Sequence, residues 1–196
     1  MPPVLRPAAR PLPARPPRDP GAPLSSDTPP EGLRLLNRAP AADAEATLLT
    51  CCGSHRWARR MTAHRPYPTL ESLLAAADEA AYDLAPADLA EALQQEDTTP
   101  LPDRGNLAVH TALRAAHAAY EAKFGHVFVI ALDTADPAVA LDQAMAGLRT
   151  RLDHDEDRES AVTAEQLRRI TRARLARLAT RGDGPRRRAL AHAHRP

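Results

Sequence analysis

Cysteine and histidine side chains are the first candidates for chemistry in this sequence. Cys51 and Cys52 are adjacent, a spacing that strains a disulfide and supplies too few thiols for a zinc site. His110 and His117 lie seven residues apart, so they share one face of a helix and either could reach a pocket, although a helix surface is commoner. No two histidines lie four residues apart beside a carboxylate, the usual zinc-binding spacing on a helix. We therefore expect reduced thiols and no bound metal.

Two arginines, Arg149 and Arg151, are the second candidates. The planar guanidinium pairs with carboxylates and carbonyls through two parallel hydrogen bonds, so an arginine is well suited to grip an anion. Acidic residues surround the pair, among them Asp153, Asp155 and Glu156. Taken alone, such a cluster favours a charged helix end in solvent for both arginines.

Hydrophobic residues at three- and four-residue steps predict the helices that would position these side chains. The predicted segments are 43–61, 69–77, 86–93, 107–123, 136–152 and 163–178. Each of five begins at a capping residue or a first-turn proline: Asp43, Thr69, Pro86, Asp136 and Thr163, the last with Gln166 as a capping box.

One apolar run does not fit this pattern. Gly125 is placed to end the helix before it in the left-handed conformation, and residues 127–132 are then continuously apolar. The run is too isolated to build a sheet, so we expect a buried extended segment. Leu113, Ala119, Val139 and Leu148 are expected to face inward on the flanking helices. The predicted class is all-α, with a single domain.

Composition divides the chain into a folded centre and two unstructured ends. Residues 1–30 hold 11 of the 20 prolines and predict a disordered arm, and residues 182–196 predict a disordered Arg-rich tail. The domain between them covers residues 31–181. The net charge is +1, which indicates neither nucleic-acid nor membrane binding, and no apolar run predicts a membrane span or a secretory signal. We expect a cytoplasmic protein.

Three segments resemble the motifs of one family, in the same order and with similar spacing. The first is Cys51-Cys52-Gly53-Ser54, Trp57-Ala58 and Arg65-Pro66-Tyr67, similar to C-C-G-S-x-x-W-A … R-P-F. The second is Tyr120, Lys123-Phe124-Gly125-His126 and Phe128-Val129, similar to Y-x-x-K-F-G-F-x-F-V. The third is Arg151-Leu152, Glu159, Ile170 and Arg174-Leu175, similar to R-L-x-N … E … I … R-L. Through these segments the chain resembles the OHCU decarboxylases.

The resemblance implies a helical, usually dimeric protein that uses neither a metal nor an organic cofactor. Its substrate would be a small molecule, 2-oxo-4-hydroxy-4-carboxy-5-ureidoimidazoline, which loses carbon dioxide and is protonated stereospecifically to (S)-allantoin in urate degradation. Arg151 falls on the family's functional arginine. The substrate-cradling backbone of the family falls on Gly125, Phe128, Val129 and Ile130, which core packing alone would also explain.

The sequence departs from the family at its other catalytic groups. Glu96 stands where the family's H-P-x-x-G motif has histidine, and the interval from Glu96 to Phe124 is too short for its S-x-x-E-Q helix. Glu96 could carry a proton if burial raised its pKa. One alternative is a catalytically impaired relative that binds a ligand or a protein. Another is an interaction module that uses the proline arm and the arginine tail.

Overall fold

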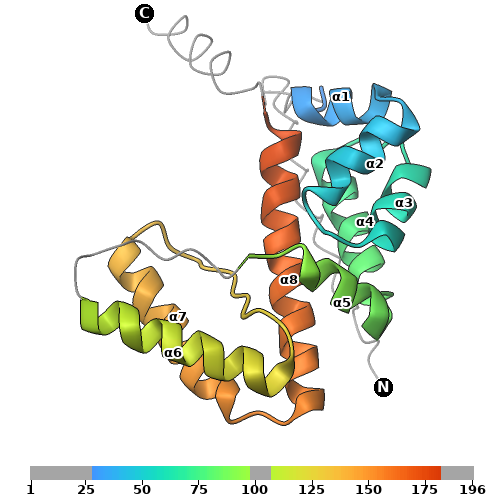
Figure 1. The fold of residues 1–196 in the computed structure, drawn as a ribbon. Coiled ribbons are helices and arrows are strands. Elements are labelled where there is room, and N and C mark those ends of the chain that lie inside the picture. The colour runs from blue at the N-terminus through green and yellow to red at the C-terminus, as the bar shows by residue number, and fades with distance from the viewer. Residues whose placement is uncertain (1–27, 98–106, 182–196) are drawn as a thin grey trace, which may run out of the picture.

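The computed structural model describes residues 28–97 and 107–181, and the side chains of 111–181 in the second range. These residues form helices and no strand (Figure 1), which confirms the all-α class. The helices are α1 (Glu31–Arg38), α2 (Ala41–Leu49), α3 (His55–Ala63), α4 (Leu70–Tyr82), α5 (Pro86–Gln94), α6 (Leu107–Phe124), α7 (Pro137–Leu152) and α8 (Glu156–Ala179). None of them is long and apolar enough to cross a membrane. The predictions for the two ends concern residues that lie almost entirely outside the described ranges.

Several helix ends lie where local sequence signals predict them. Thr69 caps α4, and its hydroxyl accepts a hydrogen bond from the backbone N–H of Ser72 at 3.1 Å. Pro86 occupies the first turn of α5, and Asp136 caps α7. Gly125 ends α6 with φ +75, a conformation that costs glycine nothing and other residues much more.

Two predicted helix starts are wrong. The first helix expected to start at Asp43 starts at Ala41 instead, so Asp43 lies in the first turn of α2. The segment is also two helices, because the chain turns after α2 and Ser54 then caps α3 by accepting a hydrogen bond from Trp57 N. The last helix begins at Glu156 rather than at Thr163, with Asp155 as its cap. An acidic cap and first turn stabilise the positive helix end, and Thr163 is left inside the helix with its hydroxyl facing the protein interior.

The larger core lies among α1 to α4 and the C-terminal half of α8. Trp57 is fully buried at its centre, and its indole N–H donates to the carbonyl of Ala77 at 3.1 Å. Leu33, Leu48 and Leu175 are buried members of the same cluster. Through this core, α8 packs against α1 and α4 (Figure 1).

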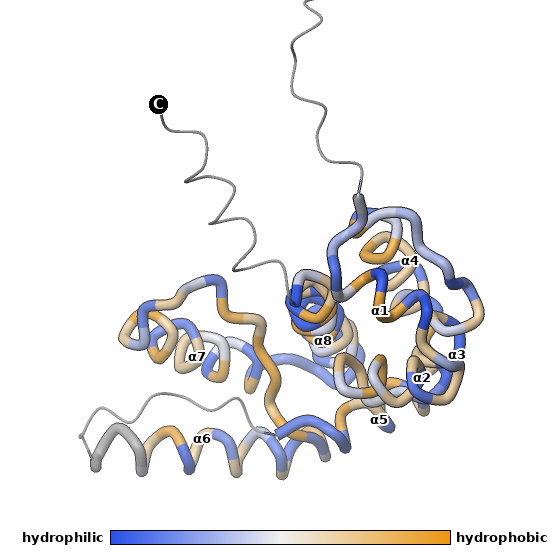
Figure 2. The backbone as a smooth tube through the Cα atoms, turned by 90° about the horizontal axis from the view of Figure 1, so that it is seen from above, coloured by the Kyte–Doolittle hydropathy of each residue, from blue (hydrophilic) through white to orange (hydrophobic). Residues whose placement is uncertain are grey.

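A second, smaller core joins α6 and α7. Its buried members are Leu113, Tyr120, Phe128 and Leu148. Phe128 comes from residues 127–132, which run extended between the two helices without forming a strand, as predicted; Figure 2 shows this stretch as largely hydrophobic. Two inward predictions are wrong, since Ala119 is exposed and Val139 is 43% exposed.

Gly32 is expected to tolerate no side chain where α1 crosses the end of α8. A Cβ there would lie 2.1 Å from the carbonyl oxygen of Leu178, and backbone cannot move aside as a side chain can. We expect Gly32→Ala to lower the free energy of unfolding by about 1–3 kcal/mol, measured by urea denaturation. Gly147→Ala is the matched control, because its Cβ would meet only side chains, at 3.1 Å and beyond. Equal stability of the two variants would contradict the prediction.

Candidate functional site

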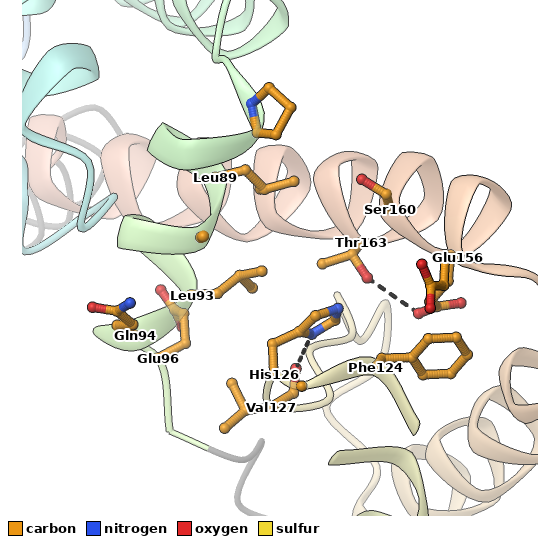
Figure 3. A pocket seen from close by; sticks show the side chains of 14 residues that line it. Leu89, Leu93, Gln94, Glu96, Phe124, His126, Val127, Glu156, Ser160 and Thr163 are labelled. Carbon is orange, nitrogen blue, oxygen red and sulfur yellow. Dashed lines mark hydrogen bonds between the residues drawn. The ribbon is translucent and has the colours of Figure 1, made fainter. Parts of the chain in front are cut away.

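A pocket of about 480 Å³ lies between α5, the end of α6 and the N-terminal half of α8. Leu89 and Leu93 line one side of it from α5, and Phe124 lines the far side from the end of α6, near Glu156. The polar side chains of α8, among them Ser160 and Thr163, form a polar wall between these two sides (Figure 3). The volume is in the range of pockets that hold small organic molecules.

Local structure explains how the lining residues reach this pocket. The left-handed turn at Gly125 redirects the chain after α6, so that His126 and Val127 line the pocket. On α8, Glu159 and Thr163 lie four residues apart and therefore on the same face of the helix, which is the face toward the pocket.

Arg151 lies directly behind this polar wall. Its Nε donates to Glu159 at 2.7 Å and its Nη1 to the carbonyl of Val129 at 2.6 Å. Its Nη2 donates to the hydroxyls of Tyr120 at 2.9 Å and Thr163 at 2.8 Å. The side chain is 4% exposed and is not among the residues that line the pocket. The predicted functional arginine therefore reaches the pocket only through the residues that it holds.

Glu159 is the centre of this buried network. Tyr120 donates its hydroxyl to the carboxylate, and the ring of His154 bonds the other carboxylate oxygen at 2.8 Å. Burial alone would raise the pKa of Glu159, but the hydrogen bonds from Arg151 and Tyr120 outweigh it and hold that pKa below its usual value. Burial, together with the hydrogen bond to Glu159, raises the pKa of Tyr120 to about 12. The wall thus holds a carboxylate whose charged form is favoured by the guanidinium behind it.

Glu96, the other predicted catalytic residue, lines the pocket from the end of α5. Arg174 holds both of its carboxylate oxygens, at 2.5 and 2.8 Å. The ion pair joins α5 to α8 and raises the pKa of Arg174. Both carboxylate oxygens of Glu96 are therefore engaged in a structural contact.

The four predicted cradle residues take different places. Gly125 lines the pocket. Phe128 belongs to the smaller core. Val129 is also buried, and its carbonyl accepts from Arg151. Ile130 lines a separate groove beside α8. Residues 125–130 therefore lie at the site, but Phe128 and Val129 are buried behind the pocket lining rather than part of it.

The pocket also contains residues to which the sequence assigned no role. His126 and Thr163 line it, and His154 stands behind Glu159 with its Nε2 buried and unpartnered among the described residues. A signal for His126 existed, since it replaces a phenylalanine of the matched motif. Thr163 was predicted to cap a helix, so its hydrogen bond with Arg151 was not expected.

The two cysteines and the possible metal ligands were the other candidates for chemistry. Cys51 and Cys52 are buried free thiols, and burial raises the pKa of each. A thiol with a raised pKa is a poor nucleophile near neutral pH. Across the described part of the chain, no three His, Cys, Asp or Glu side chains gather in a way that could hold a metal ion.

Comparison with known proteins shows which family the chain belongs to. A search of curated protein sequences finds no match, but the family model for OHCU decarboxylase matches residues 37–98 and 100–176. The fold is similar to a crystal structure of OHCU decarboxylase in the presence of (S)-allantoin, with 22% identity, a TM-score of 0.58, and coverage of 67% of this chain and 96% of that chain.

A crystal structure of (S)-allantoin synthase is also similar, with 21% identity and a TM-score of 0.57. The match covers 74% of this chain but 53% of that one, so this chain spans about half of the synthase's length. At these identities the two structures establish the fold alone, and membership rests on the family model, which spans most of the chain. The chain belongs to the OHCU decarboxylase family.

Proposed function

We propose that this protein is a carboxy-lyase that decarboxylates 2-oxo-4-hydroxy-4-carboxy-5-ureidoimidazoline and forms (S)-allantoin. The observation that carries the proposal is the pocket between α5 and α8, which is lined by apolar side chains of α5 and α6 and by polar side chains of α8. It lies within the region that the family model matches, and a neighbour in fold was crystallised in the presence of (S)-allantoin.

The charges around the pocket are compatible with an anionic substrate. Two of its carboxylates are buried, and each is paired with a guanidinium: Glu159 with Arg151 and Glu96 with Arg174. These pairs remove most of the repulsion that a substrate carboxylate would meet. Glu156 is exposed at the pocket rim, where solvent screens it.

The reaction asks little more of the protein than binding, exclusion of water and control of one proton. When the carboxylate leaves, the ring C=N bond of the substrate accepts the electron pair, so no separate electron sink is needed. The apolar side chains of Leu89, Leu93 and Phe124 exclude water from the leaving carboxylate, while Ser160 offers a hydroxyl to the ureido group.

Incubating the purified chain with freshly generated substrate is expected to produce optically active allantoin faster than the spontaneous reaction does, followed by circular dichroism. Ser160→Tyr should abolish the gain, because its ring would fill the pocket. Asp157→Tyr is the control, since Asp157 is exposed on the same helix and does not line the pocket. A wild-type rate equal to the spontaneous rate would overturn the proposal.

One observation favours a second candidate, a non-catalytic relative that binds a purine-derived ligand. The two side chains expected to do chemistry, Arg151 and Glu96, are both engaged by protein groups. Such a relative would bind (S)-allantoin in a calorimetric titration, lose that binding in Ser160→Tyr, and show no turnover.

A further inference from the structure

Four titratable side chains line the pocket between α5 and α8: Glu96, His126, Glu156 and Glu159. If the proposed decarboxylation takes place there, one group must deliver a proton to a single face of the substrate ring. Stereospecific delivery requires a donor that is held in a fixed orientation and has a free hydrogen-bonding atom directed into the pocket.

The three carboxyl groups do not meet this requirement. Glu96 uses both oxygens to pair with Arg174. Glu159 uses one oxygen to bond Arg151 and Tyr120 and the other to bond His154, and the hydrogen bond from the guanidinium favours its charged form. Glu156 is exposed in the first turn of α8, and no hydrogen bond to a described residue orients it.

His126 meets both parts of the requirement. Its Nδ1 lies 3.0 Å from the carbonyl oxygen of Val127, and because a carbonyl only accepts, Nδ1 must carry the hydrogen. The ring also packs edge-on against Tyr120 and stacks near Phe124, with centroids 5.5 and 6.4 Å apart. Nε2 has no hydrogen-bond partner among the described residues, and the ring projects into the pocket toward the side of Thr163 (Figure 3).

We infer that His126 is the catalytic proton donor of this protein, an inference that rests on the proposed decarboxylation. Loss of carbon dioxide breaks the carbon–carbon bond and leaves its electron pair delocalised into the ring C=N bond. The Nε2–H bond of the imidazolium then breaks, and its proton forms the new C–H bond at the ureido-bearing carbon. The substrate hydroxyl proton passes to the ring nitrogen as the carbonyl forms, and the neutral imidazole regains a proton from water.

Because the anchor is the backbone carbonyl of Val127, the imidazole keeps one orientation in both protonation states. Nδ1–H donates to that carbonyl throughout, and only Nε2 changes its proton. Delivery from one side of the pocket would then set the handedness of the product. His126, in the connection between α6 and α7, therefore takes the proton-transfer role that the sequence had suggested for Glu96.

The test compares His126→Gln, His126→Phe and the exposed control His64→Gln, which lies at the end of α3 and outside the pocket. We expect both His126 variants to lose about 100-fold or more in kcat with KM nearly unchanged. Their residual allantoin should lose its optical activity, because water protonates either face. The control should match the wild type in rate and in optical purity, and calorimetric binding of (S)-allantoin checks that each variant retains a folded pocket.

Suppose that the wild type turns over substrate and that His126→Gln keeps the wild-type kcat and optical purity. That result would overturn the inference and leave the proposed function standing. The same conclusion would follow if Glu96→Gln lost optical purity and His126→Gln kept it. A wild-type protein with no turnover at all would remove the proposed function and this inference together.

Discussion

Replacing Arg151 with methionine is expected to lower the free energy of unfolding by about 3–5 kcal/mol. Arg151 is 4% exposed, and its guanidinium donates to Glu159, Val129, Tyr120 and Thr163. Without it, the Glu159 carboxylate remains buried with no opposing guanidinium, and burying an unpaired charge is among the most destabilising changes a core can suffer. Urea denaturation at neutral pH measures the loss.

The chain provides a matched control two residues earlier on the same helix. Arg149 is exposed in the last turns of α7, so Arg149→Met should change stability by no more than about 0.5 kcal/mol. The double variant Arg151→Met/Glu159→Met should recover part of the loss, because it removes both charges at once. An Arg151→Met protein as stable as Arg149→Met would show that the buried pair contributes nothing.

Replacing Glu159 with glutamine is expected to cost about 3 kcal/mol at neutral pH, the lower end of the range for breaking a buried ion pair. The amide oxygen can still accept one hydrogen bond from Arg151, but it carries no charge and cannot also satisfy His154 and Tyr120. The same variant should change the acid sensitivity of the protein.

The direction of the pH effect follows from the lowered pKa of Glu159. In the unfolded chain this carboxyl takes up a proton around its ordinary pKa of 4.5, whereas in the folded protein its pKa is lower, so it does so only at lower pH. The unfolded state therefore binds more protons in that window, so the stabilisation is fully present above the unfolded value and is lost as pH falls through the folded one. Glu159→Gln should show a shallower loss of stability over this window than the wild type.

Glu79→Gln serves as the control for that experiment, because Glu79 is exposed on α4. It should keep the wild-type dependence of unfolding free energy on pH, including the part from Glu165, whose pKa the surface ion pair with Arg168 also lowers. Identical acid profiles for Glu159→Gln and the wild type would contradict the assigned role of Glu159.

Features that depend on neighbours within about four residues were predictable from the sequence. The cap of Thr69 on α4, the first-turn proline of α5, the cap of Asp136 on α7 and the left-handed turn at Gly125 are all found as expected. Each of these signals is a local backbone preference that tertiary packing does not override. Thr163 shows the limit of such signals, since its side chain is used by Arg151 and an earlier cap begins the helix.

The sequence by itself determined the helical class, the starts of α4, α5 and α7, the turn that ends α6 and the three segments that mark the family. Only the tertiary structure decided which side chains share the pocket. Tyr120 meets Glu159 across 39 residues and Glu96 meets Arg174 across 78, and such pairings follow from how whole helices pack. Helical periodicity assigns a residue to a face of its own helix, whereas the partner of that face depends on the crossing of α5, α6 and α8. For this reason Arg151, which the motif predicted to be functional, lies behind the pocket wall, while His126 projects into the cavity.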